Sequence, residues 1–334
     1  MLLALAAGAA LAAASVTPTT ALAPQAPSNA PIGNGDLLVN IGSTETYLGD
    51  LYLFDSSGRN KRRLTRTGDI LSAAFSPDGR RIVFAKSETA NPDVGDLYLM
   101  RADGTRVARL TNTPTVNEGF PSFSRDGSKI AFLGYDFGER RQYLGYLAPR
   151  AEAPVTEILS VPYDDPHIYC TAAWPTGRFD SPTWSPLGDS LAVAHSCLDE
   201  PNYTSTIDIV GLRGRRLHTS AHVANMGEID FRPDGKKIVF SSFDSIQENP
   251  DPFLSVFDRE AGTMTQITDP ADKSYDYPVW SPNGALIAAY RSHWPYPDPP
   301  RYELVTIKPD GTGARVLASG SETARLIPMD WRAR

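Results

Sequence analysis

The sequence is short of histidine, of positive charge and of long apolar runs. Its five histidines are scattered along 334 residues, and no Gly-x-Ser-x-Gly, His-Glu-x-x-His or phosphate-loop motif occurs, so the motifs give catalysis little support. Beyond the first 26 residues, no segment approaches 18 consecutive apolar residues, so no transmembrane helix is predicted. The formal net charge is −7. A nucleic-acid surface needs a basic face, so a basic peptide, a cation or a neutral partner fits better.

The first 26 residues also lack charge. Residues 2–14 form an apolar stretch that is too short to span a bilayer of about 30 Å as a helix, and a Pro-rich segment follows it. This pattern predicts a signal peptide within 1–26 and a flexible tail at 27–35, and hence export to a periplasm or to the cell exterior. No Lys or Arg precedes the apolar stretch and Pro24 follows the Ala-Leu-Ala of 21–23, so a buried helix is the alternative. The leader has no cysteine, so no lipid anchor is expected.

Repetition is the main feature of the rest of the chain. The 28 prolines and 26 glycines lie mostly between short apolar runs, which favours turns and short strands. The stretch AAFSPDGRRIVFAKS, residues 73–87, predicts a hairpin around a Ser-Pro-Asp-Gly turn. Similar stretches start at Pro121, Pro182, Glu228 and Pro278.

The spacing of the turn glycines sets the length of the repeat. These are Gly79, Gly127, Gly188, Gly235 and Gly284, with spacings of 48, 61, 47 and 49. Proline at the second position and glycine at the fourth position of the Ser-Pro-Asp-Gly stretch suit a type I turn. A second phrase follows the hairpin, as in GDLYLMRADGTRVARLT from Gly95, where apolar residues alternate as in a half-buried strand. One unit is predicted to hold four antiparallel strands in about 47 residues, the size of a propeller blade.

The two ends of the chain complete each other. Five whole units lie at about 69–115, 116–161, 180–220, 227–269 and 276–318. Residues 36–66 match a unit without its inner strand, and 326–332 match that missing strand. We therefore expect an all-β, six-bladed β-propeller over 36–332, closed by a C-terminal inner strand that joins an N-terminal three-strand blade. Closure removes the free strand edges, and a monomer is expected.

The phrases FSPDGRRIVFAKS and GDLYLMRADGTRVARLT resemble the repeats of TolB-type propellers, the WD40-like family known as PD40, over residues 36–332. The resemblance implies a six-bladed β-propeller. TolB proper is periplasmic, carries an additional N-terminal α/β domain and works in an envelope-spanning complex. This chain has a Pro-rich tail in that place, so it is more similar to stand-alone exported propellers of this type. For those the resemblance implies scaffolding or ligand binding.

Four acidic residues precede the predicted inner strands, which line the central channel of a propeller. They are Glu118, Asp180, Glu228 and Asp276. Like charges repel, so a ring of them at the channel mouth favours a basic partner segment, an arginine or, as a minor case, calcium. The alternative is that each acid caps a loop or pairs with Arg178 or Arg325. We expect function on the face that holds these loops.

Two longer loops on the same face are further candidates. The insertion at 161–179 accounts for the spacing of 61, and long loops in compact domains are often functional. Its acids and aromatics suit recognition of a peptide or a sugar, although a lid over the channel is the alternative. The residues are Asp164, Asp165, His167, Tyr169 and Trp174. The second loop, 291–301, carries His293 and Trp294 as candidates for the same surface. The alternative is that this loop is only a stiff connector.

The two cysteines, Cys170 and Cys197, fall in the same predicted blade near that face. In an oxidising compartment their placement predicts a disulfide that pins the insertion. Free buried cysteines are the alternative.

These observations favour a protein- or peptide-binding scaffold that acts through the loop face and the channel mouth, without a cofactor. The alternative is a metal-assisted hydrolase or lyase acting on a carbohydrate or peptide at the same face. It would need His167, His222 and His293 to converge with carboxylates.

Overall fold

The computed structural model describes residues 34–88, 91–162, 178–188, 190–199, 202–220, 223, 225–243, 251–269, 273–293 and 300–333. Within these ranges the chain forms 24 β-strands and no helix, so the all-β prediction is confirmed. No helix in this part of the chain is long and apolar enough to cross a membrane.

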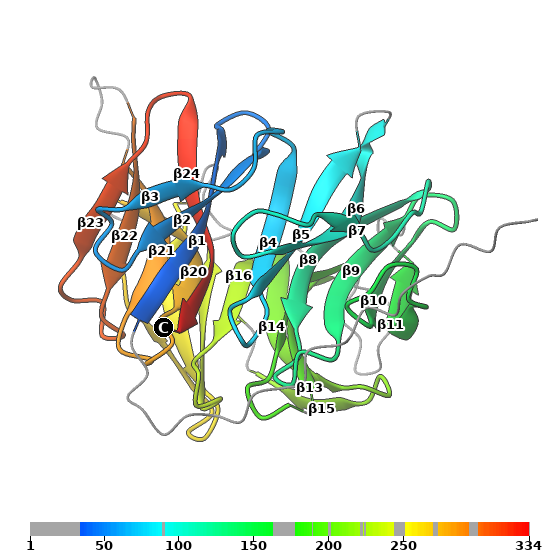
Figure 1. Cartoon of the computed structure of the whole chain (residues 1–334). Helices are drawn as coiled ribbons and strands as arrows, with labels where there is room; N and C mark the ends of the chain where they lie inside the picture. Colours follow the sequence, from blue (N-terminus) through cyan, green and yellow to red (C-terminus); the bar gives the residue numbers. More distant parts are fainter. Residues whose placement is uncertain are drawn as a thin grey trace, which may run out of the picture.

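The strands form six blades of four antiparallel strands each (Figure 1). A single pairing, Gly49 opposite Ile70, links the first two blades into one eight-stranded sheet. The first blade consists of β24 (Ala324–Ala333), β1 (Asn34–Ser43), β2 (Gly49–Asp55) and β3 (Lys61–Arg63). The second consists of β4 (Ile70–Phe75), β5 (Arg81–Glu88), β6 (Asn91–Arg101) and β7 (Ala108–Arg109). The third consists of β8 (Val116–Phe123), β9 (Ile130–Asp136), β10 (Arg141–Leu147) and β11 (Thr156–Pro162).

The other three blades repeat this order. The fourth consists of β12 (Arg178–Trp184), β13 (Ser190–Asp199), β14 (Asn202–Gly211) and β15 (Arg216–Thr219). The fifth consists of β16 (Met226–Phe231), β17 (Lys237–Ser242), β18 (Phe253–Asp258) and β19 (Thr263–Gln266). The sixth consists of β20 (Ser274–Trp280), β21 (Ile287–His293), β22 (Arg301–Ile307) and β23 (Arg315–Ser319).

The predicted closure of the ring is present. The last strand, β24, pairs antiparallel with the first, β1, over a register that runs from Asn34 opposite Ala333 to Ser43 opposite Ala324. Figure 1 shows these two strands, red and blue, side by side. We call this pairing the seam. It supplies the first blade with the inner strand that residues 34–63 lack.

The Ser-Pro-Asp-Gly turns follow from local hydrogen bonds. In the second blade the Asp78 carboxylate accepts from the Arg80 amide at 3.1 Å and from the Ser76 hydroxyl at 2.5 Å. The Ser76 hydroxyl in turn accepts from the Arg81 amide at 2.9 Å. Gly79 has a φ of 65°, a region that glycine adopts without steric cost. The turn residues therefore specify where each first hairpin reverses.

Six apolar cores hold the ring together, one between each pair of neighbouring blades. The core at the seam joins Leu37, Phe54 and Trp331 of the first blade to Leu304 and Val279 of the sixth. Polar contacts add to this packing near the axis. The Asp330 carboxylate accepts from the Phe75 amide of the next blade at 2.7 Å, and the Asp230 carboxylate accepts from the Trp280 amide in the same way.

Because Trp331 of the seam strand β24 packs into the core shared by the first and sixth blades, loss of its side chain should destabilise the whole ring. Trp331 is 5% exposed, so Trp331→Ala should lower the free energy of unfolding by about 3–5 kcal/mol. Val316, which is 42% exposed on β23, provides the control, and Val316→Ala should cost under about 0.5 kcal/mol. Urea unfolding measures both. Equal small losses would show that the seam contributes little to stability.

Candidate functional site

Three of the predicted acids come together on the axis side of the inner strands. Asp180 of β12 and Asp276 of β20 lie four residues before Trp184 and Trp280, at equivalent positions of their blades. Glu228 of β16, in the blade between them, interacts electrostatically with both. We call Asp180, Glu228, Asp276 and Arg325 the mouth cluster. It draws one residue from each of four consecutive blades, the fourth, fifth, sixth and first.

Glu228 and Asp276 form a hydrogen-bonded carboxyl pair. Burial within the ring, together with the negative charge of Asp276, raises the pKa of Glu228 well above its usual value. Burial also raises the pKa of Asp276, and the Ser241 hydroxyl, the Tyr277 amide and the charge of Arg325 oppose that rise. Protonated Glu228 can therefore donate to the Asp276 carboxylate, and the pair gains negative charge when this proton leaves.

Asp180 pairs with Arg178, as one of the alternatives in the sequence analysis proposed. The Arg178 guanidinium Nε lies 3.2 Å from the Asp180 carboxylate. The Tyr135 hydroxyl of the third blade is 3.5 Å from the same carboxylate. Burial raises the pKa of Asp180, and Arg178 opposes this rise. Because the Arg178 side chain is 62% exposed, this ion pair is open to exchange with an incoming cation.

Arg325 is the second residue of β24, the inner strand of the first blade, and lies among tyrosines. Its guanidinium is 4.1 Å from the ring centroid of Tyr47 and 6.0 Å from that of Tyr290. Tyr47 lies in the β1–β2 loop with a φ of 60° and a 44% exposed side chain. A non-glycine residue at such a φ is uncommon and is found most often at turns and binding sites. The aromatic contacts orient Arg325 without neutralising it.

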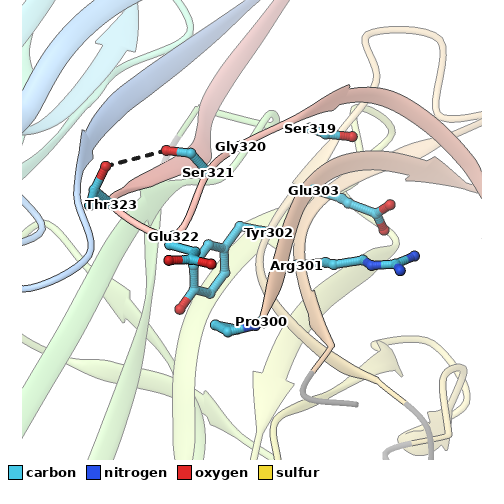
Figure 2. A pocket seen from close by; sticks show the side chains of 9 residues that line it. All are labelled: Pro300, Arg301, Tyr302, Glu303, Ser319, Gly320, Ser321, Glu322 and Thr323. Carbon is cyan, nitrogen blue, oxygen red and sulfur yellow. Dashed lines mark hydrogen bonds between the residues drawn. The ribbon is translucent and has the colours of Figure 1, made fainter. Parts of the chain in front are cut away.

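A shallow pocket of about 550 Å³ adjoins this cluster on the sixth blade (Figure 2). Its polar lining includes Arg301, Glu322 and the hydroxyls of Ser321 and Thr323. Figure 2 shows the Tyr302 ring next to Glu322, with Arg301 and Glu303 on the other side of β22. The Tyr302 ring also lies 5.9 Å from the Arg325 guanidinium. The pocket thus extends the mouth cluster outward along the loop face.

Two acids that sequence reasoning missed lie deeper along the axis. Asp230 and Asp330 each immediately precede the last aromatic residue of an inner strand, Phe231 and Trp331. They come from blades that are not neighbours, yet they interact electrostatically, as groups that face a common axis do. Burial raises the pKa of Asp330 to about 6. The repeat was the signal, because each of these acids directly precedes the aromatic residue near the end of its inner strand.

The prediction that Glu118 lines the channel mouth is wrong. Glu118 is 0% exposed and faces the junction of the second and third blades. It accepts hydrogen bonds there from the hydroxyls of Thr111 and, at 3.2 Å, Thr113. The reason is register: Glu118 lies five residues before Phe123, whereas Asp180 and Asp276 lie four before their tryptophans, and all three precede the register shift of their strand. Glu228 lies within the shift of its own strand. A shift of one residue turns a strand side chain to the other face.

Glu118 is part of a buried acidic group with Asp96 of β6. The Asp96 carboxylate pairs with Arg109 of β7. Burial and, to a smaller extent, the charge of Asp96 raise the pKa of Glu118 to about 7, against the opposing effect of the Thr111 hydroxyl. Tyr143 of β10 faces the same group, and its pKa is raised by burial and by the Glu118 charge.

Several predicted site residues lie outside the described residues. These are Asp164, Asp165, His167, Tyr169, Cys170 and Trp174 of the insertion, together with His222 and Trp294. The disulfide between Cys170 and Cys197 stays a prediction for the same reason. His293 ends β21 opposite Arg301. In the described part of the chain, no hydrogen bond or ion pair joins His293 to the mouth cluster, and no three His, Cys, Asp or Glu side chains are grouped as metal ligands.

Solved structures with the same architecture include TolB from Acinetobacter baumannii. It is 19% identical, with a TM-score of 0.67 over 89% of this chain and 66% of that chain, so this chain spans just under two thirds of its length. A protein from Agrobacterium tumefaciens assigned as TolB is 15% identical, with a TM-score of 0.60 over 90% and 99% of the two chains.

An oligogalacturonate lyase in complex with manganese is also similar in structure. It is 14% identical, with a TM-score of 0.53 over 87% of this chain and 73% of that chain. No family model and no curated protein matches the chain. At these identities the similarity shows the fold, which is that of a TolB-like β-propeller.

The buried position of Glu118 predicts a pH dependence of stability. Its pKa is about 7 in the folded chain, against an ordinary value of 4.5, so the folded state binds this proton more tightly than the unfolded state does. As pH rises from about 4.5 to 7, the Glu118 contribution to the free energy of unfolding should fall by at most about 3 kcal/mol, then level off.

Urea unfolding across this pH range compares the wild type with Glu118→Gln and with Glu45→Gln, an exposed control. Glutamine cannot ionise, so Glu118→Gln should make the fall in stability smaller by the Glu118 contribution, whereas Glu45→Gln should follow the wild type. Parallel profiles for all three proteins would contradict the assignment.

Proposed function

Starting from a TolB-like propeller fold, we propose that this chain is an exported binding or scaffold module that engages a protein or peptide through its loop face. The mouth cluster carries the proposal. Four consecutive blades bring Asp180, Glu228, Asp276 and Arg325 to one end of the axis, and a single rigid ring presents them together.

The charge of the mouth cluster favours a basic partner segment. Three carboxyl groups oppose the charges of Arg178 and Arg325. Arg178 lies at the surface, where an incoming lysine or arginine can displace it from Asp180. Such a side chain can also replace the proton held between Glu228 and Asp276. Arg325 and its tyrosines then supply a neighbouring contact for a backbone carbonyl or carboxylate of the same segment.

Export, the monomeric state and the assignment of 36–332 to one domain belong to the same proposal. Export is supported by the uncharged leader and by the similarity of the fold to TolB. The paired seam leaves β1, which pairs with β2 and with β24, without a free edge that would need a partner strand.

The enzyme alternative keeps one supporting observation, the similarity in fold to a lyase that was solved with manganese. Its histidines, His167 and His222, lie outside the described residues. The described residues support the binding role, because they form a charged mouth cluster with a shallow pocket beside it.

Removal of the mouth charges should weaken binding of a basic segment. Asp180→Asn/Asp276→Asn should lower the affinity for a lysine- and arginine-rich peptide at least about tenfold, since two desolvated partners of the cation are lost. The control Glu152→Gln/Glu260→Gln removes the same charge from exposed positions on the opposite face and should change little. Calorimetric titration measures the affinities, and cross-linked capture of native partners uses the same proteins.

Equal losses in both double variants would mean that the peptide responds to net charge alone, and the mouth would then not be the site. Equal capture of one partner by the wild type and the mouth variant would also contradict the proposal and would point to the 161–179 insertion.

The pKa directions add a pH signature. Burial holds the pKa values of Asp180, Glu228 and Asp276 above their usual range. The affinity for the basic peptide should therefore continue to rise at pH values above the usual carboxyl range, as these groups lose protons. In Asp276→Asn the rise should be smaller. An affinity that is flat or falls over this range would contradict a carboxylate-based site.

A further inference from the structure

One segment of the first two blades, residues 55–109, is rich in positive charge. Residues 55–109 contain eleven Lys and Arg against seven Asp and Glu, whereas the whole chain contains 32 against 39. This segment is therefore net positive within a chain of net charge −7. The mouth cluster cannot explain the excess, because none of its four residues lies within 55–109.

Five of these cations lie at the end of the propeller opposite the mouth, where the hairpin turns are. They are the exposed residues Arg59, Arg62, Arg80, Arg101 and Arg106, which we call the basic rim. Backbone contacts hold the turns together. The Arg62 guanidinium donates to the Asp103 carbonyl at 3.0 Å, and the Ala102 amide donates to the Arg80 carbonyl at 2.8 Å. The third-to-fourth strand turn of the second blade thus lies against both the first hairpin turn and β3.

The acids on the same turns point their carboxylates into the turns themselves. Asp55 accepts from the amides of Ser57 and Arg59, and Asp103 accepts from the amide and hydroxyl of Thr105. Asp78 accepts from the Arg80 amide and the Ser76 hydroxyl. These carboxylates maintain turn geometry. All five rim arginines are exposed, although Arg62 also donates to the backbone carbonyls of Ala102 and Asp103.

An apolar side chain lies next to the rim. Val107 is 56% exposed and directly follows Arg106, which has a φ of 56°. That region costs a non-glycine residue free energy. An exposed apolar residue between arginines is the pattern of segments that rest at a lipid–water interface, where the cations meet head groups and the apolar group enters the boundary.

We propose that the basic rim is a docking surface for an anionic lipid bilayer, separate from the mouth cluster. Charge complementarity supports this partner. The rim consists of short turns on an outer edge, and the pocket described above lies on the sixth blade instead. A protein partner needs a pocket or anchor residues, whereas an anionic bilayer needs a surface with several cations at similar height. Docked in this way, the chain would turn its mouth away from the membrane and toward its partner.

Co-sedimentation with vesicles tests the proposal on the mature protein. The vesicles contain phosphatidylglycerol in phosphatidylcholine, or phosphatidylcholine alone. The wild type should bind the anionic vesicles only, and rising salt should release it. Each arginine near the bilayer is worth about fivefold in partitioning, so Arg59→Gln/Arg106→Gln should weaken binding about 30-fold.

The matched control is Arg66→Gln/Arg140→Gln, which removes two exposed arginines at the loop end of the blades. It should bind anionic vesicles nearly as well as the wild type. No binding of the wild type at low salt, or equal weakening in both variants, would overturn the proposal. Binding to polyglutamate but not to vesicles, or a salt-sensitive self-association by light scattering without vesicles, would assign the rim to a protein partner and would likewise overturn it.

Discussion

The seam between β1 and β24 is the constraint on which the rest of the structure depends. A propeller blade cannot bury both of its faces alone, so each apolar core in the ring exists only while the next blade is in place. The seam completes the first blade, and that blade then covers the cores shared with the second and sixth blades. A contact between residues almost 300 positions apart therefore determines whether the other five blades are enclosed.

The mouth cluster depends on the same contact. Arg325 is the second residue of the seam strand β24, and Tyr47 lies in the loop that follows its partner strand β1. The acids come from the three blades that precede the seam. If the ring opened there, Arg325 would lose Tyr47 and Asp276 would lose the nearby positive charge that opposes its protonation. The electrostatics of the mouth cluster therefore depend on ring closure.

The fold was largely predictable because its signals are local and repeated. The turn glycines, the apolar runs and the complementary chain ends each indicate one arrangement. The site was less predictable, because it depends on a register that the repeat does not fix in every blade. Asp180 and Asp276 share a position and face the axis, while Glu118, one residue earlier, faces a blade junction. Every inner strand also has a register shift. Asp230 and Asp330 were not predicted because they lie further along the inner strands, away from the loops in which candidate residues were sought.

Native-state hydrogen exchange at the seam tests the central claim most directly. If the seam is part of the cooperative ring, the amides of Leu38 and Ile327, which lie in the paired region, should exchange only by global unfolding. Their opening free energies should then equal those of Phe132 and Ile238, which lie in the middle of the third and fifth blades. Clearly lower opening free energies at Leu38 and Ile327 would show that the ring opens locally, and the seam would not be the contact on which the fold depends.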